Sequence, residues 1–249
     1  MWVTIDVEEV QDMNFNIKWK KPPVVDYKSN VDWFIKLAKG RKATAFVLGS
    51  FAKKYPGIVR DLSERFEIAS HGFHHKLVYN QPFEEWEKEL LDSKEILEKI
   101  TKKEVLGYRS PSWSMPFEKK YYEVLAKSGF KYSSSYFPMK NYMYGNSVNK
   151  KQPFKIYTRS GIIEERPVPR GIVPFSGGFY LRVLPLFYLK RQFKKHKNSV
   201  LYIHPYELMD TDLLVYFKKY AKINLDYILA FFHFGSTRKK LAKIINEMG

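Results

Sequence analysis

The chain of 249 residues is 45% hydrophobic and 17% aromatic and contains no cysteine. A chain of this length can bury a large core, and α/β barrels of this size form single units. The lack of cysteine excludes disulfides, thiolate metal ligands and a cysteine nucleophile. The formal net charge of +17 attracts polyanions, so an anionic membrane surface or a polyanionic glycan is an expected contact. A solvated lysine-rich surface would explain the same charge.

Nucleic acid is not an expected partner, because no zinc finger, RNA-binding signature or basic zipper accompanies the positive charge. The amino terminus enters Trp2-Val3-Thr4-Ile5-Asp6 without a basic start or an apolar signal core. No apolar run approaches the ~20 residues of a membrane-spanning helix. These features predict a cytoplasmic location and are compatible with peripheral contact with a membrane.

Strand and helix patterns alternate along most of the chain, which predicts an α/β fold with a parallel sheet or barrel. Residues 138–183 lack this periodicity and are expected to form loops and hairpins rather than a second domain. Expected strands cover 2–7, 43–48, 66–70, 105–109, 130–132, 154–158, 162–168 and 200–204. Expected helices cover 30–39, 58–65, 83–100, 117–127, 184–196, 213–222 and 237–248.

Half of the six histidines fall within five positions, in the segment Ser70-His71-Gly72-Phe73-His74-His75. His71 and His75 are four residues apart, so one helical turn would bring both rings to one side. Two imidazoles arranged in this way can bind one divalent metal ion. An isolated pair with this spacing is also compatible with exposed loop histidines. The choice between a metal site and a loop therefore depends on the residues elsewhere in the chain.

Other chemistry-bearing residues also lie where expected strands end. The first strand ends in Asp6 and Glu8, which face the same way because they are two residues apart. Arg109 and His204 follow later strands. The carboxyl ends of parallel strands meet on one face, where enzymes of this class place their chemistry.

Two histidines and a carboxylate form the usual ligand set of a catalytic metal, and a second carboxylate and a histidine can act as base and acid. The pattern therefore predicts metal-assisted hydrolysis of an amide or ester. Each residue has a simpler interpretation when taken alone. Asp6 and Glu8 could be an exposed strand end, Arg109 could cap a helix, and His204 could be a core histidine with satisfied hydrogen bonds.

The ordered motifs resemble the polysaccharide deacetylase family, the NodB-homology fold of carbohydrate esterase family 4. They are Ile5-Asp6-Val7-Glu8-Glu9, Glu67 to His75, Gly107-Tyr108-Arg109-Ser110-Pro111-Ser112-Trp113-Ser114, Tyr132-Ser133-Ser134-Ser135 and His204-Pro205-Tyr206-Glu207. Residues 176–185 resemble the carboxy-terminal extension of a subgroup associated with exopolysaccharide export. The resemblance implies one domain over residues 1–249, a distorted (β/α)7 barrel, with a loop and hairpin insertion at 138–183 and the extension at 184–249.

The resemblance also implies a function and residue roles. The expected function is removal of N-acetyl groups from hexosamine residues of a cell-surface or exported polysaccharide. Glu8, His71 and His75 would bind a divalent metal, most commonly Zn²⁺, with Co²⁺, Ni²⁺ or Mn²⁺ as alternatives. The expected catalytic roles are Asp6 as general base, Arg109 as the residue that orients it and His204 as general acid, with Trp113 and Tyr206 as substrate-binding aromatics.

Three departures from the family pattern leave questions open. The common Asp-Asp-Gly is Asp6-Val7-Glu8 here, which moves the carboxylate ligand one residue along. His74 replaces a Ser or Thr and could compete with His75 as a ligand. Ser133 stands where many relatives have aspartate, so the carboxylate partner of His204 is unassigned.

Two other functions fit the same residues. Some proteins of this fold open small cyclic amides, as allantoinases do. A non-catalytic glycan-binding relative would also retain the fold, but the loss of Asp6 or His204 would favour that interpretation, and both residues are present.

Overall fold

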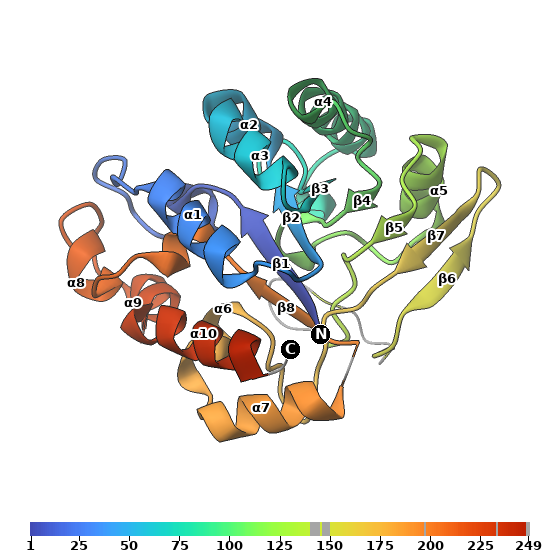
Figure 1. Cartoon of the computed structure of the whole chain (residues 1–249). Helices are drawn as coiled ribbons and strands as arrows, with labels where there is room; N and C mark the ends of the chain where they lie inside the picture. Colours follow the sequence, from blue (N-terminus) through green and yellow to red (C-terminus); the bar gives the residue numbers. More distant parts are fainter. Residues whose placement is uncertain (140–144, 146–149, 197, 233, 248–249) are drawn as a thin grey trace. The chain divides into compact units, whose positions relative to one another are not determined.

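The computed structural model describes residues 1–139, 145, 150–196, 198–232 and 234–247 (Figure 1). The chain divides into two compact units, Met1–Ala43 with Gly171–Gly249, and Thr44–Arg170. We call these the terminal unit and the central unit and describe each by itself. Residues 140–144 and 146–149 of the expected insertion lie outside the described residues.

The central unit is built on a mixed sheet with the strand order β6-β7-β5-β4-β3-β2. Its strands are β2 (Ala43–Val47), β3 (Glu67–Ser70), β4 (Gly107–Tyr108), β5 (Tyr132–Ser133), β6 (Phe154–Tyr157) and β7 (Ile162–Glu165). Neighbouring strands run parallel except β6, which is antiparallel to β7. All five residues of β2 are buried, as expected of a strand covered on both faces.

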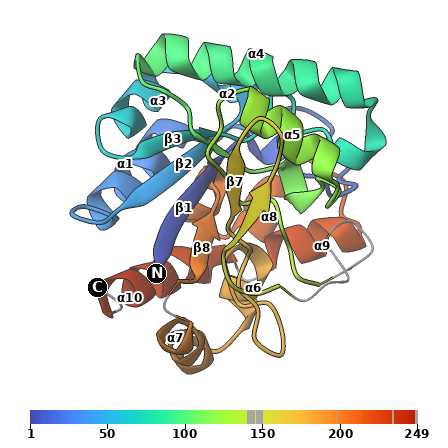
Figure 2. The same cartoon turned by 90° about the vertical axis from the view of Figure 1, so that its right-hand side faces the viewer.

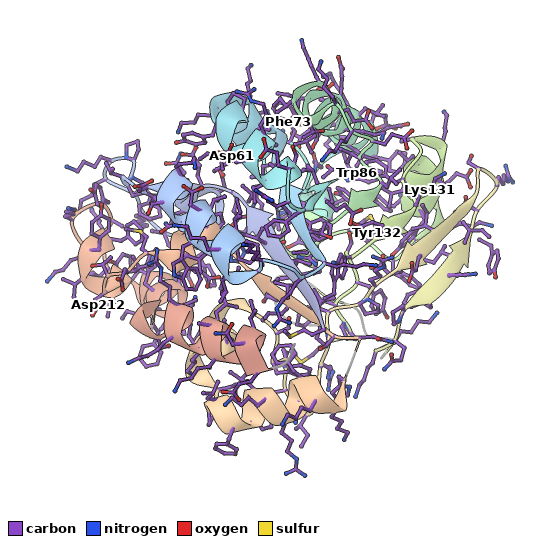
Figure 3. All side chains as sticks on the ribbon, viewed as in Figure 1. Asp61, Phe73, Trp86, Lys131, Tyr132 and Asp212 are labelled. Carbon is purple, nitrogen blue, oxygen red and sulfur yellow. The ribbon has the colours of Figure 1, made fainter. Side chains whose placement is uncertain are left out.

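Helices pack along one side of this sheet, where α2, α3, α4 and α5 lie side by side in Figure 1. They are α2 (Gly49–Lys54), α3 (Pro56–Ser63), α4 (Phe83–Thr101) and α5 (Lys119–Lys127). Figure 2 shows α4 lengthwise. Its buried residues Trp86, Leu90 and Leu97 follow the helical period. The Trp86 indole (Figure 3) donates a 3.0 Å hydrogen bond to the Tyr108 hydroxyl, which joins the helix to β4.

The terminal unit contains the parallel pair β1 (Trp2–Val7) and β8 (Val200–Ile203). Its helices are α1 (Tyr27–Leu37), α6 (Gly178–Val183), α7 (Leu186–Lys195), α8 (Leu213–Phe217), α9 (Leu225–Phe231) and α10 (Thr237–Glu247). α10 packs against α6 and α7. Short 3-10 helices across the two units cover Val10–Asp12, Val78–Asn80, Pro111–Trp113, Pro205–Leu208 and Phe234–Ser236.

The strand predictions are confirmed for all eight segments, although several strands are shorter than expected. Three helices of the described residues, α2, α6 and α9, were not predicted, because each has only six or seven residues and shows no clear helical period. The predicted helix 213–222 ends at Phe217, and residues 220–222 instead pair with residues 18–20 through the Trp19–Ala221 bridge. Within the described part of the chain, no helix has both the length and the apolar character needed to cross a membrane.

Candidate active site

The central unit brings three strand ends into line. Ser70 of β3 pairs with Tyr108 of β4, and Tyr108 pairs with Ser133 of β5. The residues that follow, His71 and Arg109 among them, therefore leave the sheet at its carboxyl edge. The sequence prediction that these motifs follow strands is confirmed here.

His71 and His75 come together through a turn, not through the helix that their spacing suggested. Residues 71–77 form no helix; Gly72 has a φ of 82° and His75 a φ of 56°. These left-handed conformations fold the segment back, so the two rings lie 5.3 Å apart between centroids. The helix prediction was wrong because two residues in the left-handed region cannot continue a right-handed helix.

Burial distinguishes the two candidate ligands His74 and His75. His75 is buried beside His71, whereas His74 is exposed and its ring lies against Phe73, 4.6 Å away. This difference in burial favours His75 over His74 as the proposed ligand. Only His75 shares a buried position with His71.

The hydrogen bonding of His71 determines which of its nitrogens can bind a metal. Its Nδ1 lies 2.8 Å from the backbone carbonyl oxygen of Arg109. A carbonyl oxygen can only accept a hydrogen bond, so Nδ1 carries the proton and Nε2 keeps its lone pair. Such an outer hydrogen bond commonly fixes the tautomer of a metal-binding histidine.

Arg109 is fully buried in the central unit. Its guanidinium carbon lies 4.0 Å from the centre of the Phe46 ring, and Nη2 donates a 3.0 Å hydrogen bond to Ser134 Oγ. A cation held over an aromatic face inside a core is stabilised by the ring quadrupole. The simpler interpretation of Arg109 as a helix cap does not describe these contacts.

The loop after Arg109 stores backbone strain. Ser112 and Trp113 have φ angles of 49° and 51°, an arrangement that costs roughly 1–3 kcal/mol for each residue without a compensating environment. Ser114 helps to hold the loop, since its Oγ donates to the Pro111 carbonyl and accepts a 2.9 Å hydrogen bond from Val78 N–H. Trp113 is 7% exposed and packs against Phe137.

The terminal unit brings the other predicted site residues together. Ile5 of β1 pairs with Ile203 of β8, so Asp6 and His204 follow at the same level of this strand pair. Asp6 and Glu8 are both 1% exposed. They are not an exposed strand end, and two buried carboxylates need a cationic partner to be stable.

His204 is not a fully enclosed core histidine. Its side chain is 17% exposed, and its Nε2 lies 3.9 Å from Glu8 Oε1. Burial acts to lower the pKa of His204, but the charges of Glu8, Glu207 and Asp6 together with a hydrogen bond to Glu207 outweigh burial and raise the pKa to about 9. The ring is therefore held in its cationic form near neutral pH, as a general acid requires.

Glu207 is the carboxylate partner of His204 that the sequence left unassigned. His204 Nδ1 lies 2.9 Å from Glu207 Oε2, and the His204 backbone N–H donates to the same oxygen. The three-residue spacing is that of a capping box at the start of a helical turn, and this local signal could have identified Glu207. Tyr206, 4% exposed, stacks on His204 and donates a 3.2 Å hydrogen bond to Glu8 Oε1.

Two protein-family models match adjacent parts of the chain. Residues 36–133 match the polysaccharide deacetylase model, and residues 134–248 match a domain of unknown function. The first segment includes His71, His75 and Arg109, and the second includes His204. No curated protein matches the sequence.

Solved structures are similar over most of the chain. A polysaccharide deacetylase described as putative, from Mycobacterium smegmatis, is 20% identical with a TM-score of 0.58, covering 88% of this chain and 70% of that one. A CE4 family pseudoenzyme from Bacillus anthracis is 12% identical with a TM-score of 0.53, covering 100% and 60%. The Puue allantoinase is 13% identical with a TM-score of 0.61, covering 99% and 83%.

Residues 36–133 therefore match the polysaccharide deacetylase family, and the solved structures support the NodB-homology fold of carbohydrate esterase family 4 for the chain. The expected fold class, an α/β fold of the distorted (β/α)7 barrel type, is confirmed by these neighbours. Family membership supports a hydrolase that deacetylates a polysaccharide. The expected subgroup, the insertion 138–183 and the extension 184–249 stay predictions. The family also includes pseudoenzymes, so the roles of individual residues need their own test.

Proposed function

We propose that this protein is a metal-dependent deacetylase that removes N-acetyl groups from hexosamine residues of a cell-surface or exported polysaccharide. The observation that carries the proposal is the match of residues 36–133 to the deacetylase family, combined with retention of every residue type that the hydrolysis needs. Loss of Asp6 or His204 would have favoured a binding-only relative. Both residues are present and both belong to the terminal unit.

Glu8, His71 and His75 would hold the metal. The donor chemistry suits a metal, because His71 keeps the lone pair of Nε2, His75 is buried beside it, and Glu8 carries a buried carboxylate. Two imidazoles and a carboxylate suit Zn²⁺ best, and Co²⁺, Ni²⁺ or Mn²⁺ can use the same set. When bound, such an ion polarises the acetyl carbonyl and makes water a stronger nucleophile.

Protons are moved by the residues around this set. Asp6 accepts a proton from the water that attacks the acetyl carbonyl carbon, and Arg109 orients Asp6. His204 then donates its proton to the sugar nitrogen as the carbon–nitrogen bond breaks, releasing acetate and a free amine. The raised pKa of His204 supports the assignment of this residue as the acid rather than the base. Trp113 and Tyr206 are the proposed aromatic groups near the substrate.

The test is acetate release from N-acetylated chito-oligosaccharides and peptidoglycan fragments. The metal is first stripped and Zn²⁺ or Co²⁺ is then restored. We expect acetate only with metal, and Asp6→Asn should retain bound metal while losing activity, because it removes only the base. Normal turnover by Asp6→Asn would refute the assignment of the base. Turnover of allantoin without acetate release from any glycan would replace the proposal with a small-amide hydrolase.

A further inference from the structure

A buried ion pair lies directly behind His204 in the terminal unit. Arg182 of α6 and Glu207 are 4% and 2% exposed, and Arg182 Nη1 donates to Glu207 Oε1. Arg182 also donates from Nε to the Phe232 carbonyl at 3.0 Å and from Nη2 to the Ala230 carbonyl at 2.9 Å. A buried ion pair is expensive to desolvate and adds little stability by itself, so its other contacts indicate what it does.

The carboxylate of Glu207 joins Arg182 to His204. One oxygen accepts from Arg182, and the other accepts from both the backbone N–H and Nδ1 of His204. Because a carboxylate can only accept here, Nδ1 carries a proton and Nε2 is the nitrogen that lies on the side of Glu8. The pair thus sets the orientation of the ring and keeps the proton on Nδ1 once Nε2 has given up its own.

We propose that Glu207 and Arg182 are positioning residues for the proton transfer by His204. This inference rests on the proposed function. Both residues and His204 lie in the segment that matches the domain of unknown function. That domain would therefore complete the deacetylase site by supplying an acid whose partner is built into the same segment, in place of the aspartate that Ser133 replaces.

Kinetics separate a positioning role from a structural one. We expect Glu207→Gln and Arg182→Lys to lower kcat by roughly 10- to 100-fold, with KM and bound metal within twofold of wild type. Arg191→Lys, on an exposed helix position, is the matched control and should leave kcat unchanged. Guanidinium added to Arg182→Ala should restore part of kcat if the missing cation acts on Glu207. Unchanged kcat in Glu207→Gln would overturn the inference.

Nitrogen-15 NMR of the His204 ring gives a readout that does not need turnover. Wild type should show a hydrogen-bonded Nδ1 proton that Glu207→Gln weakens or shifts, as the charge of its acceptor is lost. If wild type releases no acetate but shows this proton, the proposed function fails while the arrangement of the pair stands. If wild type is active and the Nδ1 proton is absent, the positioning inference fails alone. Should Glu207→Gln not fold, Arg182→Lys serves both measurements.

A second inference comes from an exposed apolar stripe on α9. The stripe consists of four side chains that are 36–70% exposed and follow the i, i+3, i+4, i+7 spacing of one helix face: Leu225, Ile228, Leu229 and Phe232. The opposite face buries Tyr227, Ala230 and Phe231. A surface helix normally has one apolar face, so this second face is unusual. Ile223, directly before the helix, is 52% exposed and extends the stripe.

Two lysine-bearing segments lie next to α9, because Trp19 and Phe217 both contact Phe231 of this helix, at 6.3 and 4.8 Å between ring centroids. The segments 18–21 and 218–222 pair through hydrogen bonds from Lys20 N–H to the Tyr220 carbonyl and from Lys222 N–H to the Lys18 carbonyl. Both segments carry exposed lysines, which are Lys18, Lys20, Lys21, Lys218, Lys219 and Lys222. The nearby acids are engaged with backbone N–H groups, Asp226 with Asn16 and Asp212 (Figure 3) with Leu214.

The structure points to a peripheral docking surface for an anionic lipid bilayer, made of the α9 stripe and the six lysines. Exposed apolar side chains beside basic ones suit the boundary between acyl chains and acidic headgroups. Charge decides against a second copy of the chain as the occupant, because each copy carries a net charge of +17 and the lysines of both would face one another.

Vesicle co-sedimentation tests this surface with phosphatidylcholine vesicles, with and without phosphatidylglycerol. We expect binding only to the anionic vesicles, weakened about fivefold for each lysine removed in Lys218→Gln, Lys219→Gln and Lys222→Gln. Leu225→Ser with Ile228→Ser should weaken binding at least tenfold, whereas Phe187→Ser, at an apolar site on α7 that is 75% exposed, should not. Equal binding by the α9 variant and wild type, or binding to nucleic acid or glycan alone, would refute the proposal.

Discussion

Glu165 offers a sharp test of the electrostatics of the central unit. Its side chain on β7 is fully buried and accepts hydrogen bonds from the N–H groups of Ser135 and Tyr136 and from the Tyr122 hydroxyl. Burial raises its pKa from 4.5 to about 7, more than these hydrogen bonds lower it. The folded protein therefore keeps Glu165 protonated at a pH where the unfolded chain has already ionised.

The direction in which stability changes with pH follows from the number of protons bound by the folded and unfolded states. Since the folded pKa is the higher one, the stabilising contribution of Glu165 is complete below about pH 4.5 and is lost as the pH rises through about 7. One pKa unit corresponds to about 1.4 kcal/mol, so the full loss is about 3 kcal/mol. Roughly 2–3 kcal/mol of this loss falls between about pH 5 and 8.5, because part of the titration lies at lower pH.

Glu165→Gln replaces the protonated acid with a neutral group of the same shape. We expect the free energy of unfolding of this variant, minus that of wild type, to increase by about 2–3 kcal/mol from about pH 5 to 8.5. Urea unfolding monitored by tryptophan fluorescence measures it. Glu164→Gln, whose side chain on the same strand is 41% exposed, is the control and should show no such trend. A pH-independent difference for Glu165→Gln would refute the reasoning.

Two further predictions concern the histidine segment. His71→Ala should abolish both metal binding and activity, whereas His74→Ala should retain the metal because its ring is exposed; metal content after dialysis distinguishes them, and equal loss in both would contradict the ligand choice. Gly49→Ala would place a Cβ 2.4 Å from the Phe73 ring, so we expect about 1–3 kcal/mol of destabilisation and weaker metal retention. Thermal unfolding and bound zinc measure this, and a wild-type melting temperature would show that the ring can move aside.

Gly49 matters because the start of α2 holds the histidine segment. Its backbone N–H donates to the Gly72 carbonyl at 3.0 Å, and Ser50 N–H donates to the Phe73 carbonyl at the same distance. The ring of Phe73 occupies the space that a side chain at position 49 would need. The shape of the segment is therefore set by a residue more than twenty positions earlier in the chain.

Sequence patterns located all eight strands and most of the helices, and they predicted the site residues. Alternating and helical periodicity located the strands, because burial on a sheet or helix face imposes those periods on the chain. Residue type and order at the strand ends then predicted Asp6, Glu8, His71, Arg109 and His204 as the site residues. All five lie at or just beyond the ends of the parallel strands of their own units.

Which atoms of these residues are available for chemistry depends on the folded structure. The left-handed turn at His75 and the carbonyl that fixes the His71 tautomer depend on backbone geometry that the periodic pattern does not encode. The link from Arg182 to Glu207 joins residues 25 positions apart. Periodicity reports which face of an element is buried, whereas a tautomer or a buried ion pair depends on the residue that folding brings opposite.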